Sequence, residues 1–381
     1  MAGQTTSTPA QIVVAGHVCL DIIPHLTGPA DVGPGRLLNI GPASISTGGA
    51  VANTGIALHR LGVPVRLMGK VGDDLFGRAV LDVLRNSAPH LADGMIVTAG
   101  EATSYSIVIS PPGVDRSFLH CPGANDTFDA GDVRYDARDG ARLLHFGYPP
   151  IMRRMRIEGG EQLRQMFESA RAAGLATSLD LCQPDPDSEA GKTDWAILLT
   201  RVLPLVDVFL PSIEELLFML DKPSHARLAG GAVLRVVASR SLLRKLADRL
   251  TNMGAAVVVI KLGEHGLYMR TSTDAGRIAA FCARLGLDAA AWTNREIISP
   301  CFRARHVAGT TGSGDCTIAG FLAALLRGES PASAATSAAA VGACSVEAPD
   351  ATSGIPPWPA VAARVAAGWE RWPVSIDLGV V

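Results

Sequence analysis

Residues 309–315 combine a glycine-rich turn, Gly-Thr-Thr-Gly-Ser-Gly, with an aspartate, and an apolar stretch follows at 316–326. A glycine-rich turn that opens a helix leaves backbone N–H groups without partners, and the aligned peptide dipoles add partial positive charge there. Such a site binds an anion. Because a carboxylate beside a phosphate repels it, Asp315 is interpreted as a base. The two features together suit phosphoryl transfer to a hydroxyl group.

A structural interpretation of the same residues competes with this one. Gly312 and Gly314 would make a tight turn, and Asp315 would cap the helix, because aspartate is a favoured N-cap residue. Glycine-rich turns before helices are common, so this segment alone leaves both interpretations open.

A second glycine pair, Gly48 and Gly49, opens another helical pattern, and Asn53 would lie about one turn further on. The glycines let a ligand approach closely, and an amide side chain offers a donor and an acceptor to sugar hydroxyls. Asp21, just past the first apolar run, is either an acceptor for two hydroxyl groups or a solvated turn residue. The spacing does not decide between these two roles.

Two further segments have a structural and a functional interpretation. Lys261, Gly263 and Gly266 stand at the end of a β-branched run, where ligands of open α/β sheets bind, although the segment also fits a hairpin turn. Ser212 and Glu215 match a capping box. The functional alternative is that Glu215 faces a magnesium ion that keeps several of its waters.

Short apolar runs alternate with helical patterns along most of the chain. Strands are expected at residues 11–16, 63–68, 143–146, 175–179, 206–210 and 256–262, with 266–270 as a hairpin partner of the last. Helices are expected at residues 50–61, 74–84, 158–173, from 212 onward, 241–253, 315–326 and 332–346. Several strands are continuous apolar runs, which indicates an α/β fold with a largely parallel sheet covered on both faces.

Four segments interrupt this alternation. Residues 24–47 and 103–124 contain strand patterns without a helix between them, and we interpret them as a small β lid that excludes water from a reaction. Surface hairpins without a function are the alternative. Residues 220–254 and 274–303 are the hardest to place and are interpreted as insertions.

The composition limits the classes of function. The 381 residues are 48% hydrophobic with a net charge of −2 and no basic run, which favours a folded protein with a small-molecule partner rather than nucleic acid or a membrane surface. Seven scattered cysteines without a C-x-x-C pair argue against a disulfide framework and a zinc site. The N-terminus lacks the pattern of a signal peptide, and no apolar run is long enough to span a bilayer, so a cytoplasmic protein is expected.

These motifs together resemble the ribokinase-like (PfkB) carbohydrate kinase family. Residues 48–53 with Leu61 and Gly62, followed by residues 69–77, are similar to its N-terminal signature, and residues 311–315 are similar to its C-terminal one. The intermediate marks at 179–180, 210–215 and 262–266 fall in the family's order. The resemblance covers nearly the whole chain, which is therefore expected to be a single kinase domain over residues 1–381.

The resemblance implies a three-layer α/β sandwich with a β lid, ATP as phosphoryl donor, and Mg²⁺. It also implies a role for each residue of the site. The resemblance implies that Asp315 is the catalytic base and that the anion hole is formed by Gly312, Ser313 and Gly314. It implies that the sugar is contacted by Asp21, Gly48, Gly49 and Asn53. It also implies that the nucleotide is contacted by Lys261, Gly263, Gly266 and Thr311, and that Glu215 holds magnesium through water.

Two departures from the family pattern bear on the substrate and on ion use. Gly309 stands where many members have aspartate, which removes a carboxylate that a monovalent-cation site would use. Ala50 replaces the lysine of ribokinases, which favours a ketohexose or a keto sugar acid. The expectation is an ATP-dependent kinase like fructokinase, ribokinase or 2-keto-3-deoxygluconate kinase, with a homodimer through the lid as one option. A nucleoside kinase and a non-catalytic binding regulator are the alternatives.

Overall fold

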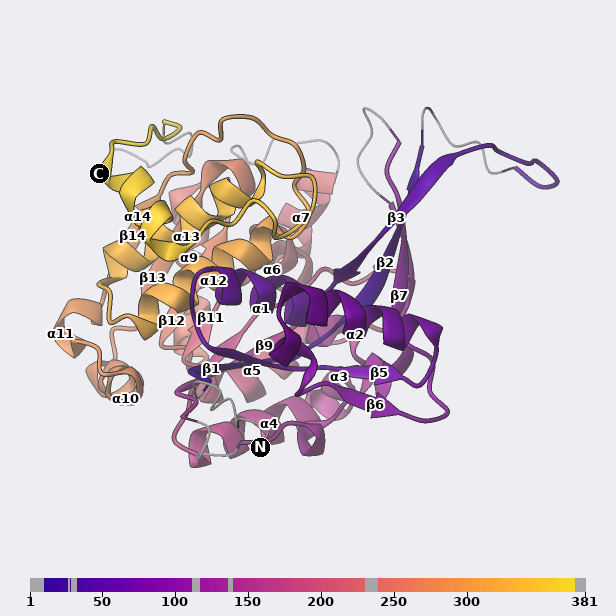
Figure 1. Cartoon of the computed structure of the whole chain (residues 1–381). Coiled ribbons are helices and arrows are strands. Elements are labelled where there is room, and N and C mark those ends of the chain that lie inside the picture. Colours follow the sequence, from indigo (N-terminus) through magenta and orange to yellow (C-terminus); the bar gives the residue numbers. More distant parts are fainter. Residues whose placement is uncertain are drawn as a thin grey trace, which may run out of the picture.

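The computed structural model describes residues 10–26, 28, 33–111, 117–135, 140–229 and 239–373. Its main body is an eight-stranded sheet (Figure 1). The spatial order is β14 (Glu296–Ser299), β13 (Leu267–Thr271), β12 (Val257–Lys261), β11 (Val208–Phe209), β10 (Ala176–Leu179), β9 (Leu143–Gly147), β1 (Ile12–Gly16) and β4 (Val65–Met68). Neighbouring strands are parallel from β4 to β12, and β13 runs antiparallel to both of its neighbours. The expected, largely parallel sheet is confirmed.

Each strand of the main sheet contributes to two hydrophobic cores. Ile12 and Val14 of β1 belong to one core, whereas Val13 and Ala15 belong to the other, because successive side chains of a strand point to opposite faces. The first core is covered by α1 (Ala50–Arg60), α2 (Leu75–Ser87), α10 (Ala275–Leu285), α11 (Ala289–Trp292), α12 (Ser313–Leu326), α13 (Pro331–Ser345) and α14 (Trp358–Ala366). The second is covered by α3 (Arg153–Arg156), α4 (Glu161–Ala172), α5 (Trp195–Val202), α6 (Ile213–Leu220) and α9 (Arg240–Asn252). This is the expected three-layer α/β sandwich.

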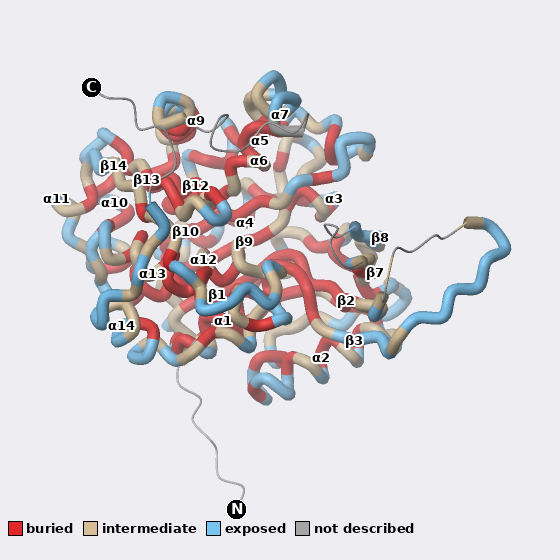
Figure 2. The backbone as a smooth tube through the Cα atoms, turned by 90° about the horizontal axis from the view of Figure 1, so that it is seen from above, coloured by how far each residue is buried: buried red, intermediate tan, exposed pale blue. Residues whose placement is uncertain are grey.

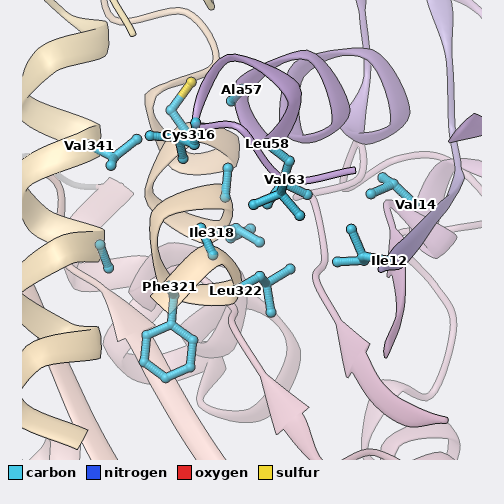
Figure 3. Close-up of a cluster of buried hydrophobic side chains, with 14 of the residues drawn as sticks. Ile12, Val14, Ala57, Leu58, Val63, Cys316, Ile318, Phe321, Leu322 and Val341 are labelled. Atoms are coloured by element: carbon cyan, nitrogen blue, oxygen red, sulfur yellow. The ribbon is translucent and has the colours of Figure 1, made fainter. Parts of the chain in front are cut away.

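Helix α12 is held in the first core along almost its whole length. Its side chains Ile318 and Leu322 lie in the same buried cluster as Leu58 of α1 and Val341 of α13 (Figure 3). Small residues bring α12 and α13 together, since a Cβ at Gly320 would lie only 2.8 Å from Val341 Cβ. Packing from both sides therefore fixes where the N-terminus of α12 points.

A separate four-stranded sheet projects from one side of the main body (Figure 1). Its order is β3 (Gly41–Gly48), β2 (Cys19–His25), β7 (Tyr105–Ile109) and β8 (Ser117–Cys121). Figure 2 shows that the arm leading into β3 is exposed, whereas the base of the sheet is buried against the body. The expected β lid is present, but it begins at Cys19 rather than at residue 24, so Asp21 lies in a strand and not in a turn.

Residues 274–303 are not an insertion, contrary to the expectation from the sequence. They contain α10 and α11 and then β14, which pairs antiparallel with β13 and completes one edge of the main sheet. Within 220–254, α7 (Lys222–Ala229) follows α6, and α9 packs on the second core; residues 230–238 lie outside the described residues. A small parallel pair, β5 (Lys70–Gly72) and β6 (Ile96–Thr98), lies near β4.

The helix expected at 158–173 begins three residues later, at Glu161. Its start is delayed because Glu158, Gly159 and Gly160 have φ of 54°, 64° and 78°, which a right-handed helix cannot include. Among the described residues, no helix combines the length and the apolarity needed to cross a bilayer.

Candidate active site

The N-terminus of α12 presents backbone donors to a cavity. Gly312 is the N-cap, with φ of 69°, and a Cβ on this residue would lie 2.5 Å from Ala351 Cβ, so glycine is required here. The N–H of Gly314 and of Asp315 has no hydrogen-bond acceptor among the described residues. Asp315 is the third helical residue and does not cap the helix, so the N-cap role that the structural interpretation gave to Asp315 is wrong, whereas Gly312 does form the expected turn.

The Asp315 carboxylate is buried, with 2% of the residue exposed, and is held by donors from two other elements. Asn53 of α1 donates from Nδ2 to Oδ2 at 2.9 Å, and the Tyr148 hydroxyl lies 3.0 Å from each carboxylate oxygen. Burial raises the pKa of Asp315, while Asn53, Lys261 and Tyr148 counteract part of that rise. The result is an oriented carboxylate with a raised pKa, which suits a general base.

The sequence analysis did not single out Tyr148. It follows β9 at the carboxyl edge of the parallel sheet, where ligands of α/β folds collect, and that position is the only sequence signal available for it. Its backbone is left-handed, with φ of 68°, a conformation that few non-glycine residues adopt. Burial, and then the negative charge of Asp315, raise the pKa of Tyr148 well above its usual value, so the phenol keeps the proton that it donates.

A buried ion pair lies beside the N-terminus of α12. Lys261, the last residue of β12, places Nζ 2.6 Å from Oδ1 of Asp180, which follows β10. The same Nζ would lie 3.9 Å from a Cβ at Gly314, so no side chain separates the ammonium group from the free amides. Burial lowers the pKa of Lys261, but the nearby carboxyl groups of Asp180, Glu215 and Asp315 raise it, and the net shift is upward. The side chain is therefore a positive charge facing the helix terminus.

Two cavities meet at Asp315. The first, which we call the Lys261 cavity, has a volume of about 570 Å³, and the second, the Asn53 cavity, has a volume of about 680 Å³. Tyr148, Gly312 and Asp315 line both cavities and so form the wall that they share. A group bound in one cavity can therefore reach a group bound in the other next to the Asp315 carboxylate.

The four residues expected to contact a sugar lie together, but only three line a cavity. Asp21, Gly49 and Asn53 line the Asn53 cavity, and Asp21 also accepts a hydrogen bond from the Cys19 thiol at 3.3 Å. A Cβ at Gly48 would lie 2.3 Å from Asp21 Oδ2, so Gly48 makes room for this carboxylate. Gly49, with φ of 88°, is required for a similar reason, since its Cβ would lie 2.5 Å from a ring nitrogen of His17.

The residues expected to contact a nucleotide are divided between the cavities. Lys261, Gly263 and Gly266 line the Lys261 cavity, together with Ser313 and Gly314. The two glycines also belong to the turn between β12 and β13, so the hairpin interpretation is confirmed. Thr311 lies instead on the Asn53 cavity.

Glu215 forms the capping box that its spacing with Ser212 indicated. Its Oε2 accepts from the Ser212 N–H at 2.7 Å, and Ser212 Oγ accepts from the Glu215 N–H at 3.2 Å. Both residues also line the Lys261 cavity. The described residues contain no group of three or more His, Cys, Asp or Glu side chains arranged to hold a metal ion on their own.

Two more residues of the Asn53 cavity, His17 and Arg156, were missed because no motif marks them. His17 is buried, and neither ring nitrogen has a partner among the described residues. Burial, and then His120, lower the pKa of His17 well below its usual value, so its imidazole is neutral. Arg156 also lines this cavity, and no ion pair with another described residue neutralises it.

Comparisons with known proteins agree with this architecture. Fructokinase-2 of Oryza sativa subsp. japonica is 24% identical over 188 residues, which cover 49% of this chain and 52% of the rice protein. The aligned stretch thus spans about half the length of that relative. The probable fructokinase-4 of Arabidopsis thaliana is 23% identical over 274 residues, covering 71% of this chain and 75% of the relative.

Solved structures share the fold across nearly the whole chain. The Arabidopsis thaliana ribokinase complexed with ribose and ATP has a TM-score of 0.70 at 18% identity, covering 93% of this chain and 98% of the ribokinase. The Xylella fastidiosa fructokinase with bound ATP has a TM-score of 0.68 at 20% identity, covering 94% of this chain and 98% of the fructokinase. Residues 9–358 match the family model described as pfkB family carbohydrate kinase. This chain belongs to the pfkB family of carbohydrate kinases.

Proposed function

We propose that the protein transfers the γ-phosphoryl group of ATP to a hydroxyl group of a small sugar or sugar acid. One observation carries the proposal: the buried Asp315 carboxylate lies on the wall between two cavities, with free helix amides on one side and Asn53 on the other. Membership of the pfkB family supports it. We treat the chain as a single kinase domain with its lid.

On the donor side, the Lys261 cavity suits the phosphate groups of a nucleotide. The N–H groups of Gly314 and Asp315 and the dipole of α12 offer positive charge to an anion. The Lys261 ammonium, held by Asp180, adds a full charge close to the same point. These groups are in place before the reaction, so they stabilise the charge that develops on the moving phosphoryl group without having to reorganise.

On the acceptor side, Asp315 takes the proton of the attacking hydroxyl group. Asn53 and Tyr148 hold the carboxylate in position and favour its ionised form, because both donate hydrogen bonds to it. In a loose transition state the hydroxyl becomes acidic late, so an ionised carboxylate is an adequate acceptor. Asp21 and Gly49 line the same cavity as Asn53, and on this proposal they contact other hydroxyl groups of the sugar.

The charge of the Lys261 cavity fits a nucleotide that arrives with Mg²⁺. Acidic side chains outnumber basic ones in its lining. Lys261 is the only cationic side chain among the described lining residues, whereas the carboxyl groups come from Asp180, Glu214, Glu215, Glu264 and Asp315. Carboxylates with water are the ligands that Mg²⁺ prefers, and the ion usually needs few of them. Glu215 would hold it through water. When bound, the ion neutralises charge on the phosphate oxygens.

A substrate panel with coupled ADP detection tests the proposal. Ketohexoses, aldopentoses, keto sugar acids and nucleosides are each offered with ATP and Mg²⁺, and ADP release above the rate without acceptor is the expected result for at least one sugar. Release only with nucleosides would favour the nucleoside kinase. Ligand binding without ADP release for every acceptor would favour the non-catalytic regulator and contradict the proposal.

We also propose that two copies associate through the lid. Strand β3 is an edge of the lid sheet, and its region exposes large apolar side chains: Leu37 is 88% exposed and Ile45 59%. Such an edge favours pairing with a second chain. A cytoplasmic location fits the proposed use of ATP and the seven cysteines, all of which are free thiols.

A further inference from the structure

The chain returns to the Lys261 cavity after residue 358, where the match to the family ends. Residues 370–372 pair with residues 301–303: the Trp372 N–H donates to Cys301 O at 2.9 Å, and the Arg303 N–H donates to Glu370 O at 2.9 Å. Phe302 and Arg371 form an antiparallel bridge between these two bonds. The segment is therefore attached by backbone pairing to residues that line the cavity.

A stack of alternating cationic and aromatic side chains reinforces this attachment. The guanidinium of Arg364 lies 3.4 Å from the ring centroid of Trp369, whose ring lies 4.7 Å from that of Phe302. The guanidinium of Arg371 lies 4.0 Å from the ring centroid of Phe302, so Phe302 contacts both Trp369 and Arg371. Cation–π and aromatic contacts of this kind hold ring orientation as well as position. Phe302 is fixed in this way on the wall of the Lys261 cavity.

Trp372 extends the same wall. It lines the Lys261 cavity but remains 49% exposed, and the Arg303 guanidinium lies 4.4 Å from its ring centroid. The neighbouring lining is apolar and includes Phe302, Val307 and Val346. The cavity thus has a charged part at Lys261 and the start of α12, and an apolar part to which the C-terminal segment adds an indole ring.

We propose that Trp372 recognises the purine base of the nucleotide by aromatic stacking, and that the C-terminal segment 369–373 is thereby part of the nucleotide site. The inference rests on the proposed function, in which the phosphates occupy the charged part of this cavity. The apolar part is then left for the base, and an aromatic face is the partner that a purine prefers. Trp372 is a specificity-determining residue on this account, and its effect falls on nucleotide affinity rather than on the transfer step.

The test compares Trp372→Ala with a matched control. Trp358→Ala also removes an indole stacked on a guanidinium, that of Arg327 at 4.3 Å, but Trp358 lines neither cavity. Titration calorimetry with ADP should show affinity about 5- to 150-fold weaker in Trp372→Ala, the change expected for one stacked base. Trp358→Ala and Trp372→Phe should bind ADP nearly as wild type does. Thermal unfolding of each variant checks the fold, and Trp372→Leu replaces the alanine variant if that one is unstable.

Base preference separates stacking from a structural effect. A purine offers a larger face than a pyrimidine, so the ratio of ADP to CDP affinity should fall in Trp372→Ala and stay unchanged in Trp358→Ala. Wild-type ADP affinity in a folded Trp372→Ala protein, or an unchanged ratio, would overturn this inference and leave the kinase proposal intact. A wild-type protein that binds neither ADP nor CDP would overturn both.

Discussion

Removal of the Tyr148 hydroxyl should shift the pH dependence of the reaction. In Tyr148→Phe, Asp315 loses a donor that lies 3.0 Å from each of its carboxylate oxygens, while Asn53 still donates at 2.9 Å. A hydrogen bond to a charged group contributes about 1.5–3 kcal/mol, and 1.36 kcal/mol corresponds to about one pKa unit, so the pKa of Asp315 should rise by about 1–2 units.

The sign of the effect follows from which protonation state is active. Asp315 must be ionised to accept a proton, and burial already raises its pKa. Loss of a donor to the ionised form raises the pKa further, so the acid limb of kcat against pH should move to higher pH by about 1–2 units. Well above that limb, turnover should approach the wild-type value because Asn53 still orients the carboxylate.

The assay is initial-rate ADP release across pH, with saturating ATP and the best acceptor of the panel. Tyr135→Phe is the matched control, because its hydroxyl donates to Met166 O at 2.8 Å away from both cavities. The control should keep the wild-type limb. A limb in Tyr148→Phe that stays in place, or moves to lower pH, would refute the assignment of the limb to Asp315.

Three other substitutions have definite expected outcomes. Arg277→Met removes the guanidinium that lies 2.6 Å from the fully buried Asp207 carboxylate. The free energy of unfolding in urea should fall by about 3 kcal/mol, which is the lower end of the range for breaking a buried ion pair, because Arg284 still lies 3.5 Å from Asp207. Gly312→Ala places a methyl group 2.5 Å from Ala351 Cβ at positive φ, and turnover should fall by about 100-fold or more because the amides lose their alignment. Ile45→Glu should convert the proposed dimer into a monomer by light scattering; a wild type that is already monomeric would contradict the lid interface.

The main body of the fold was predictable because its signals are local. An apolar run such as β1 and a helix with a glycine stop such as α1 can each be recognised within a short window, and the repeated alternation of such segments determines the fold class. The turn before α12 was also recognisable, since a glycine-rich segment before an apolar run is a local signal and Gly312 is the N-cap of the helix.

The lid and the sheet edge were harder to predict because their strands are defined by distant partners. Only two residues separate β1 from β2, and β2 contains both Asp21 and Pro24, so it lacks a strand pattern. Its pairing with β3 and β7 defines it. Strand β14 has four residues and depends on β13 for all its sheet bonds. A single sequence does not show either pairing.

The same limit applies to the site. Asp315, Gly312 and Asn53 were found because each belongs to a glycine-rich motif that opens a helix. Tyr148 contacts Asp315 across 167 positions of the chain, and no local pattern marks it. Trp372 lies beside the cavity only because its backbone pairs with residues near 302.

The most direct test of the account is turnover of Asp315→Asn measured together with its nucleotide affinity. The substitution keeps the shape of the side chain and removes the base, so kcat should fall by about 10²- to 10⁴-fold, while ADP affinity by calorimetry should stay close to that of wild type. Near-wild-type turnover in this variant would contradict the assignment of Asp315 as the base between the two cavities.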